Sequence, residues 1–282
     1  MRVKDFVFAS KVSEATSLMR EIGDSAFLMA GGTSTYFIAS KTSKVAIDIT
    51  RLPLKGISRG NDTFKIGSLV TINEILKYKD TGWVLDRVAK LIANQQIRNI
   101  STIGGNLARV FYWSDMPVAL LALGGSIKLS GIASKLIKIT EAFSTSTIHK
   151  DIFNSSILDY IEIPAVTKGM GFAYAKETRT YGAFSSATAA AGVKLENGVI
   201  SEIRIAIGSV LPFPVRLTDI EDFLIGKKPE CSLLKEISFD KLNKMKLVPR
   251  EFMSDEFCRH LIKVKVTDVI CEAIKEAMGG CK

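Results

Sequence analysis

The chain has 282 residues, of which 47% are hydrophobic and 24% charged, and its formal net charge is +9. This length predicts two domains, and the composition is sufficient for ordinary buried cores. The longest apolar run, from Met116, is about half the ~20 residues that a membrane-spanning helix needs, and the N-terminus lacks the apolar segment of a signal peptide. We therefore expect a cytoplasmic protein.

The basic residues are scattered, without a long run and without interleaved aromatic residues. This distribution disfavours a nucleic-acid binder, for which such patches are typical. The cysteines are Cys231, Cys258, Cys271 and Cys281, and none of their spacings matches a zinc, iron–sulfur or redox motif. We expect them to be reduced structural thiols. Neither histidine, His149 or His260, has a partner base or nucleophile in the sequence.

In chain order, the first segment predicts a strand, a helix, a strand, a glycine turn and a strand. Ser13 is the expected N-cap of the helix in "SEATSLMREIG", and Gly23 ends it. "AFLMA" is a short apolar strand followed by a glycine pair, and "KVAIDIT" alternates as a strand. "TFKIGSLV" predicts a further strand, and Thr71 with Glu74 forms a capping box for a helix in "TINEILKY".

A longer helix is predicted from about Val84 to Gln96, after which "RNISTIGGNL" enters a second glycine turn. In "SDMPVALLAL", Ser114 caps a helix and Pro117 lies in its first turn. "SIKLS", "KLIKI", "LDYIEIP", "GFAYAKETR" and "ATAAAGVKL" are strands, and "ENG" makes a hairpin turn before "VISEIRIAIGSV". The last segment, from "SDEFCRHL" onward, predicts one amphipathic helix whose apolar side carries Phe257, Leu261, Val264, Val269, Ile270 and Ile274.

Two glycine pairs, in "MAGGTSTYF" and "STIGGNL", adjoin Ser or Thr and have no charged neighbour. Glycine tolerates positive φ, and successive N–H groups in such a turn form a concave nest for anions. Neither pair carries the Lys of a P-loop or the G-x-G-x-x-G spacing of a Rossmann turn. Two nests without a cation suit the diphosphate of a dinucleotide, and two plain tight turns are the alternative.

The stretch "ANQQIRNISTIGGNLARVFYWSDMPVALLAL" resembles the FAD-binding medium subunit of molybdenum hydroxylases of the xanthine, carbon monoxide and nicotinate dehydrogenase types. The shared motifs are QIRN-x-x-TIGGN, from Gln96 to Asn106, and AGGT, from Ala30 to Thr33. The resemblance covers nearly the whole chain. It implies an α+β fold, in which a two-lobed vanillyl-alcohol-oxidase-type FAD-binding domain precedes a small α+β C-terminal domain of the CO dehydrogenase flavoprotein type.

With a boundary near Thr167, this resemblance predicts an FAD-binding domain over residues 1–167, with lobes of about 1–55 and 56–167, and a C-terminal domain over 168–282. It also implies which residues bind the cofactor: Leu28, Met29, Ala30, Gly31, Gly32, Thr33, Ser34, Thr35, Thr102, Ile103, Gly104, Gly105, Asn106, Asp115, Leu158, Lys176 and Phe184.

In this interpretation, the first turn wraps the FAD pyrophosphate and residues 102–106 form the second wall of the site. Asp115 accepts hydrogen bonds from ribose hydroxyls, and Lys176 lies near the flavin ring. Taken without the resemblance, Asp115 is equally a carboxylate at a helix N-terminus, Leu158 is strand core and Lys176 is a surface lysine. Either Phe184 or Tyr181 covers one face of the ring, and the sequence leaves that choice open.

The resemblance further implies an oxidoreductase subunit that carries FAD. Molybdopterin and [2Fe–2S] clusters would lie on a large and a small partner chain, because this chain has no cluster ligands. Electrons from the clusters would reach FAD and then NAD+, a quinone or another acceptor, in a heterotrimer that is itself doubled. We expect no metal site, no catalytic side chain and no nucleic acid on this chain.

Four features depart from the family pattern, namely Ser34, Ser101, Cys258 and the bulky Val110–Trp113 stretch, and the first and the last bear on how FAD is retained and reached. Two alternative functions therefore remain. One is a stand-alone FAD-dependent oxidoreductase of the same cofactor fold, and the other is a non-enzymatic homologue that has lost FAD. The substrate of the whole complex is chosen on another chain.

Overall fold

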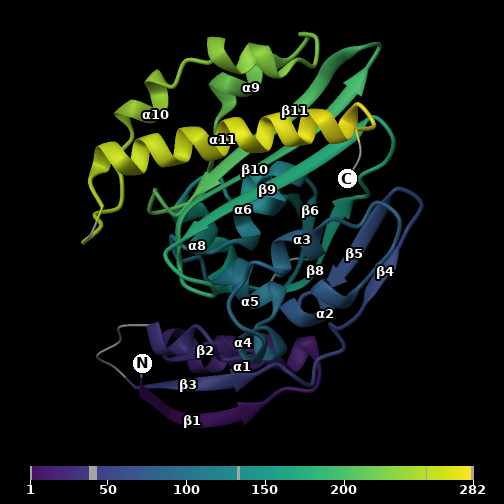
Figure 1. Cartoon of the computed structure of the whole chain (residues 1–282). Coiled ribbons are helices and arrows are strands. Elements are labelled where there is room, and N and C mark those ends of the chain that lie inside the picture. The colour runs from purple at the N-terminus through teal and green to yellow at the C-terminus, as the bar shows by residue number, and fades with distance from the viewer. Residues whose placement is uncertain (1, 38–42, 132–133, 252, 281–282) are drawn as a thin grey trace. The chain divides into compact units, whose positions relative to one another are not determined.

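The structure is a computed structural model of the chain, and it describes residues 2–37, 43–131, 134–251 and 253–280. The chain divides into two units, whose elements are labelled in Figure 1. Unit 1 comprises Met1–Lys77, Asn94–Arg109 and Ser126–Glu162. Unit 2 comprises Tyr78–Ala93, Val110–Gly125 and Ile163–Lys282. Each unit is therefore assembled from three separate stretches of the sequence.

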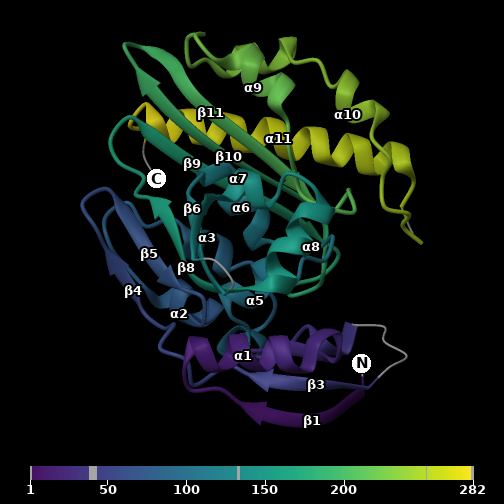
Figure 2. The ribbon, with the colours of Figure 1, turned by 180° about the vertical axis from the view of Figure 1, so that it is seen from behind.

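Unit 1 begins with a parallel three-stranded sheet of order β1–β3–β2, formed by β1 (Arg2–Phe8), β2 (Ala26–Met29) and β3 (Ser43–Asp48). Helix α1 (Val12–Ile22) lies along this sheet (Figure 2). The 3-10 turn η1 (Gly23–Ser25) follows α1 directly, and a second one, η2 (Thr35–Phe37), comes after β2. Ala15 of α1 packs with Ala9 and Ile47 in a buried cluster. The helix ends at Gly23 as predicted, with φ 62°, but Lys11 rather than Ser13 is its N-cap.

The second sheet of unit 1 has the order β4–β5–β8–β6–β7. Its strands are β4 (Ile57–Arg59), β5 (Thr63–Gly67), β6 (Ser126–Gly131), β7 (Lys135–Lys138) and β8 (Ser156–Pro164). The helices of this region are α2 (Ile72–Lys77), α4 (Gln95–Ile100), α5 (Ile103–Ala108), α7 (Ile139–Ala142) and α8 (Ser146–Ser155). The predicted capping box is present, since Thr71 N–H donates to Glu74 Oε2 at 2.7 Å and Glu74 N–H donates to Thr71 Oγ1 at 3.2 Å.

The single helix predicted from Val84 to Gln96 is wrong. The structure has a short α3 (Leu85–Ala89) in unit 2 and a separate α4 in unit 1. The backbone breaks at Ala93, which has a φ of 43°, and Asn94 starts the new helix by accepting a hydrogen bond from Ile97 N–H at 2.9 Å. Apolar periodicity runs through the segment between the two helices, so the periodicity does not reveal that α3 ends at Ala89 and that Ala93 adopts a positive φ.

Unit 2 contains an antiparallel sheet of order β12–β11–β10–β9, formed by β9 (Met170–Thr178), β10 (Ser185–Glu196), β11 (Val199–Gly208) and β12 (Val215–Arg216). The predicted hairpin turn is confirmed, with positive φ at Asn197 (52°) and Gly198 (77°). Helix α6 (Met116–Leu123) is buried along its whole length and packs on β10 and β11. The remaining short elements are α9 (Thr218–Leu224), η3 (Cys231–Glu236) and α10 (Asp240–Lys244).

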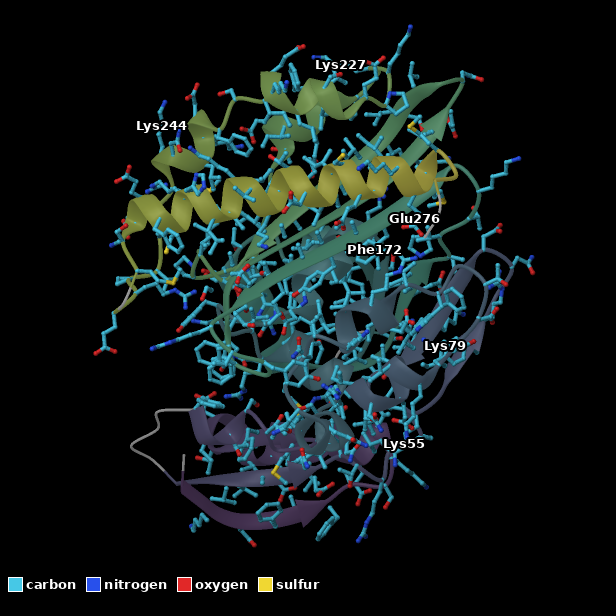
Figure 3. The ribbon with its side chains drawn as sticks, viewed as in Figure 1. Lys55, Lys79, Phe172, Lys227, Lys244 and Glu276 are labelled. Atoms are coloured by element: carbon cyan, nitrogen blue, oxygen red, sulfur yellow. The ribbon has the colours of Figure 1, made fainter. Side chains whose placement is uncertain are left out.

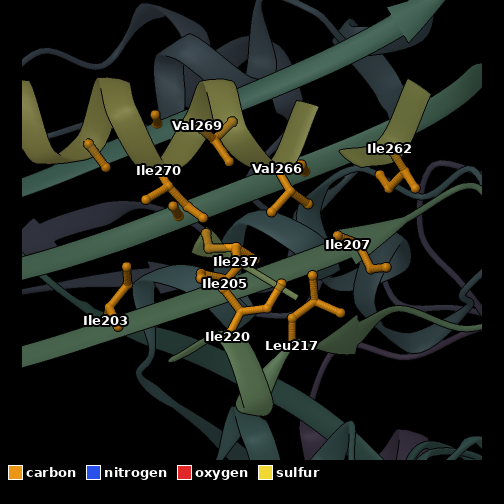
Figure 4. Packing of buried hydrophobic residues seen from close by; sticks show 14 of the residues in the cluster. Ile203, Ile205, Ile207, Leu217, Ile220, Ile237, Ile262, Val266, Val269 and Ile270 are labelled. Atoms are coloured by element: carbon orange, nitrogen blue, oxygen red, sulfur yellow. The ribbon is translucent and has the colours of Figure 1, made fainter. Parts of the chain in front are cut away.

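The predicted C-terminal helix is confirmed as α11 (Asp255–Ala277), which lies across the strands of this sheet in both views (Figures 1 and 2). Figure 4 shows Val266 and Ile270 of this helix beside Ile205 of β11. Burial of each such side chain contributes roughly 1.5–3 kcal/mol. Phe257 and Val264, predicted on the apolar side, are 51% and 40% exposed, because apolar residues occur on more than one face of the helix.

An arginine–glutamate pair joins three elements of unit 2. Arg87 of α3 donates from Nη1 and Nη2 to the Glu276 carboxylate at 2.8 and 2.7 Å, and Nη1 also donates to Phe172 O at 2.9 Å. Glu276 in turn accepts from Phe172 N–H at 3.1 Å. Figure 3 shows Phe172 and Glu276 on neighbouring stretches of β9 and α11. The pair therefore satisfies both backbone groups of a residue on the edge strand of the sheet.

Candidate functional site

The first glycine pair lies in the loop that follows β2. Leu28 and Met29 end the strand, and residues 30–34 form a turn in which Gly32 has a φ of 68°, a conformation that favours glycine. Thr35 closes the turn, because its N–H and its hydroxyl both donate to Gly32 O, at 3.1 and 2.6 Å. The sequence thus folds locally as predicted, with a short strand leading into a left-handed bend.

Most amides of this turn have no hydrogen-bond acceptor within the described parts of the chain. The N–H groups of Gly31, Gly32, Thr33 and Ser34 make no hydrogen bond to another described residue, whereas Thr35 N–H is bonded. All four residues are half-buried rather than fully exposed. Consecutive amides in such a bend form a concave anion-binding surface. The first turn therefore has the open donors that a phosphate group requires.

The second glycine pair differs from the predicted turn, because Gly104 and Gly105 lie inside helix α5. Thr102 is the N-cap, and its hydroxyl accepts from Gly105 N–H at 3.1 Å while its carbonyl accepts from Asn106 N–H at 3.1 Å. The N–H of Ile103 donates to Val70 O at 2.9 Å, and that of Gly104 donates to Ser68 O at 2.8 Å. These four amides are therefore used within unit 1, and the expected second nest of open donors is wrong.

Glycine is nevertheless required at Gly104 and at Gly31, for close backbone packing. A Cβ on Gly104 would lie 2.6 Å from Ser68 O, and a Cβ on Gly31 would lie 1.7 Å from Ile100 O. Neither distance is compatible with a side chain. We call residues 29–37 and 101–107 the first and second glycine strings. Gly31 thus contacts Ile100, the last residue of α4, which directly precedes the second string.

A hydroxyl pair joins the two strings beside this contact. Ser101 Oγ donates to Thr33 Oγ1 at 3.0 Å. Thr33 and Ser101 are 68 positions apart in the sequence, so this bond shows that the two glycine strings are neighbours in unit 1. Residues 28–35 and 94–107 contain no Asp or Glu, so neither string adds a carboxylate beside the open amides and hydroxyls. The geometry therefore fits a phosphate-bearing ligand.

Asp115 and Lys176 are brought together in unit 2. Lys176 Nζ donates to Asp115 Oδ2 at 3.0 Å and to Leu91 O at 3.1 Å. Both side chains are buried, with 7% of Asp115 and 4% of Lys176 exposed. Tyr174 OH donates to Asp115 Oδ1 at 2.6 Å. Lys176 is therefore not a surface lysine, and Asp115, at the N-cap position of α6, makes no capping hydrogen bond. Tyr174 is not marked by any motif in the sequence, but it lies on the same face of β9 as Lys176 because strand side chains alternate.

The acidity of this cluster follows from its burial. Desolvation raises the pKa of Asp115, whereas the Lys176 cation and the hydrogen bonds from Tyr174 and Lys176 lower it. Desolvation and the neighbouring Asp115 carboxylate raise the pKa of Tyr174 well above its ordinary value. Tyr174 therefore stays protonated and remains a hydrogen-bond donor to the carboxylate across the physiological pH range.

The remaining predicted residues lie in different surroundings. Leu158 is 6% exposed in β8, opposite Leu129 of β6. Phe184 is 53% exposed and stacks on Trp113 with ring centroids 4.4 Å apart, whereas Tyr181 is 80% exposed. Trp113 also stacks on Phe111 at 4.8 Å. The bulky stretch before Asp115 thus packs directly against one of the two aromatic candidates.

No metal site is evident within residues 2–37, 43–131, 134–251 and 253–280, where no three His, Cys, Asp or Glu side chains gather to hold an ion. Cys258 is a buried free thiol whose pKa burial raises. Cys271 is disulfide-bonded, so the expectation of reduced cysteines is wrong for that residue, and Cys281 lies outside the described residues. None of the described helices has the length and hydrophobicity of a membrane span.

Two family models of known proteins match this chain. Residues 2–166 match the FAD binding domain in molybdopterin dehydrogenase, and residues 172–273 match the CO dehydrogenase flavoprotein C-terminal domain. The carbon monoxide dehydrogenase medium chain of Hydrogenophaga pseudoflava is 30% identical, with 77% of this chain and 78% of that one covered. The glyceraldehyde dehydrogenase medium chain of Sulfolobus acidocaldarius is 30% identical, with coverages of 83% and 85%.

A solved structure of carbon monoxide dehydrogenase from Hydrogenophaga pseudoflava matches with a TM-score of 0.89 and 26% identity, covering 97% of each chain. The predicted α+β architecture, an FAD-binding domain followed by the flavoprotein C-terminal domain, is thereby confirmed. The chain belongs to the family of FAD-binding medium subunits of molybdenum hydroxylases, and it is an oxidoreductase subunit whose own cofactor is FAD.

Proposed function

We propose that the chain is the electron-transfer subunit of a molybdenum hydroxylase, receiving electrons from [2Fe–2S] clusters on a small partner subunit and delivering them to NAD+, a quinone or another acceptor. When bound, FAD supplies conversion between one-electron and two-electron carriers. The family membership supports this role. The expected assembly includes a large molybdopterin subunit, is a doubled heterotrimer, and is cytoplasmic.

The cofactor site proposed for this role begins with the first glycine turn. Leu28–Thr35 would surround the FAD diphosphate, with the open amides of Gly31 to Ser34 as donors, and Thr102–Asn106 would form the neighbouring wall. The single observation that carries the assignment is the packing of Gly31 on Ile100 beside the hydrogen bond between Thr33 and Ser101. Residues 1–167 would form the FAD-binding domain, with lobes of about 1–55 and 56–167, and residues 168–282 the C-terminal domain.

Asp115, Leu158, Lys176 and Phe184 complete the proposed set of cofactor contacts. Among the described residues, Asp115 and Leu91 engage two of the three Lys176 ammonium hydrogens, which leaves the third for a ligand. A cation beside a reduced flavin stabilises the negative charge that develops there. Asp115, held by Tyr174 and Lys176, keeps that cation in place and partly offsets its charge.

The test is reconstitution of the purified chain with FAD, followed by reduction in the assembled complex. We expect near-stoichiometric flavin absorbance and flavin bleaching when the complex turns over its own substrate. Flavin bleaching by a small substrate without partner subunits would instead favour the stand-alone oxidoreductase. A colourless chain that cannot be reconstituted would favour the homologue that has lost FAD.

A further inference from the structure

Arg109, which directly follows helix α5, is a half-buried arginine without a counter-ion. Its guanidinium forms no hydrogen bond or ion pair with any residue that the structure describes. The positions outside the described ranges contain no Asp or Glu, so none of them can supply a carboxylate side chain. By contrast, Arg87, Arg204 and Arg216 each form an ion pair with a glutamate.

The environment of Arg109 costs free energy that nothing in the described chain offsets. Burial lowers the pKa of this guanidinium, and no neighbouring carboxylate raises it. A guanidinium has five N–H donors and no acceptor, and it loses part of its hydration when it is buried. An arginine held in this way indicates that a bound anionic group supplies the missing acceptors.

Arg109 belongs to the same helix face as the start of the second glycine string. Its backbone N–H donates to Gly105 O at 3.2 Å, which keeps it in register with the last turn of α5. Thr102, Gly105 and Arg109 are spaced i, i+3 and i+7 and therefore share one face of the helix. Thr102 follows Ser101, whose hydroxyl bonds to Thr33 of the first glycine string. Arg109 is only about 10 Å from Thr102 along the helix axis, which is shorter than an extended dinucleotide.

The charges around this face favour an anionic ligand. Residues 25–47 and 94–114, which contain both glycine strings and their flanks, include no Asp or Glu. The two strings themselves contain no cation, so their donors are neutral amides and hydroxyls. The negative charge of oxidised FAD lies on its diphosphate, and a guanidinium matches phosphate oxygens with two parallel N–H donors. Resting on the cofactor site proposed above, we propose that Arg109 binds the FAD diphosphate and supplies the cation that the two glycine strings lack.

The experiment titrates the full chain with FAD, with ADP, which has the diphosphate but no flavin, and with riboflavin, which has the flavin but no phosphate. Arg109→Met removes the charge, and Arg109→Lys keeps the charge without the planar donor pair. Arg20→Met is the matched control, because Arg20 is an exposed arginine on helix α1 of the same unit.

We expect Arg109→Met to weaken binding of both FAD and ADP by about tenfold or more, because hydrogen bonds between charged groups are the strong ones. Its affinity for riboflavin should stay within about twofold of the wild type. Arg109→Lys should bind FAD with intermediate affinity, and the Arg20→Met control should match the wild type. Raising the ionic strength should weaken FAD binding more in the wild type than in Arg109→Met, because salt screens the charge pair.

The stability of the FAD-free chain separates ligand binding from a structural role. Arg109→Met removes a half-buried charge that has no partner, so its urea unfolding midpoint should equal or exceed that of the wild type. A lower midpoint in the FAD-free variant would assign Arg109 a structural role and contradict the proposal.

The inference is wrong if Arg109→Met binds FAD and ADP like the wild type, or if the control loses as much affinity. It is also wrong if riboflavin affinity falls as far as FAD affinity, because the lost contact would then be to the flavin. Normal FAD affinity with failed assembly would assign the arginine to a carboxylate of a partner subunit instead. If the wild-type chain binds neither FAD nor ADP, the proposed cofactor site itself fails, whatever the variants do.

Discussion

The side-chain oxygens of Thr33 and Ser101 lie 3.0 Å apart, although the residues are separated by 68 positions in the chain. This hydrogen bond stands beside the contact of Gly31 with Ile100 and joins the two glycine strings. The strings therefore act together, but in different ways. The first offers open amides, and the second begins with Ser101, which bonds to the first turn, and continues into a short capped helix.

Replacement of Gly31 by Ala should disrupt the site and the fold around it. The added Cβ would lie 1.7 Å from Ile100 O, so one backbone segment must move. We expect a loss of at least about 2 kcal/mol in the free energy of unfolding, as for other steric conflicts in packed regions, together with loss of FAD retention. Urea denaturation and flavin titration measure both. Gly60→Ala is the control, because its Cβ approaches no atom closer than Thr63 Oγ1 at 3.2 Å, and unchanged FAD binding in Gly31→Ala would contradict the assignment.

The hydroxyl pair lends itself to a double-mutant cycle. Thr33→Val and Ser101→Ala each remove one partner of the bond, and each should lower the free energy of unfolding by about 0.5–1.5 kcal/mol. The double variant should lose less than the sum of the two, because the second substitution removes a group that has already lost its partner. Strict additivity in both stability and FAD affinity would show that the two hydroxyls do not interact in solution.

Breaking the buried pair of Asp115 and Lys176 should be costly. Asp115→Asn or Lys176→Met leaves the other charge buried without its counter-ion, which typically costs about 3–5 kcal/mol. The double variant Asp115→Asn with Lys176→Met should recover much of that stability. If these residues also contact FAD as proposed, the double variant will be stable and still bind FAD weakly. Recovery of both properties, measured by denaturation and flavin titration, would assign the pair a purely structural role.

His149 should make unit 1 sensitive to mild acid. It is 4% exposed, its Nε2–H donates to Leu107 O at 2.7 Å, and burial lowers its pKa below the ordinary 6.5. Between the two pKa values the unfolded chain binds more protons than the folded one. The free energy of unfolding should therefore fall as the pH drops below about 6.5, by up to about 1.4 kcal/mol per pH unit.

His149→Gln is the comparison for this pH effect, because glutamine can donate a hydrogen bond but does not titrate. Denaturation at pH 7.5 and 5.5 should show a smaller pH dependence in the variant than in the wild type. An identical difference between the two pH values in both proteins would rule out His149 as the titrating group.

The pair of Arg87 and Glu276 should stabilise unit 2. Glu276→Gln or Arg87→Met removes charged partners of Phe172 N–H and O, and we expect a loss of about 1–3 kcal/mol, because hydrogen bonds to charged groups contribute in this range. Lys79→Met is the matched control, since Lys79 pairs with Asp86 but is 69% exposed (Figure 3), and exposed pairs contribute little. Equal losses in all three variants would indicate that burial of the pair is not what matters.

Local structure was largely predictable from the sequence. The capping box of Thr71 and Glu74, the hairpin at Asn197 and Gly198, and the C-terminal helix each depend on residues close in the chain, whose preferences act over a few positions. The AGGT and TIGGN strings were likewise enough to identify the family, because their residue types are tied to backbone conformations and close packing.

The tertiary structure alone decided the rest. Long-range packing determined that Gly104 lies in a helix, that Lys176 is buried on Asp115 and Tyr174, and that Gly31 contacts Ile100, since none of these partners is near in sequence. The positive φ at Ala93 and the choice of the buried face of α11, which leaves Phe257 and Val264 exposed, also depend on the surfaces against which these segments pack. A residue's local preference determines which backbone conformations have low free energy. The contacts that select among those conformations come from parts of the chain that only folding brings together.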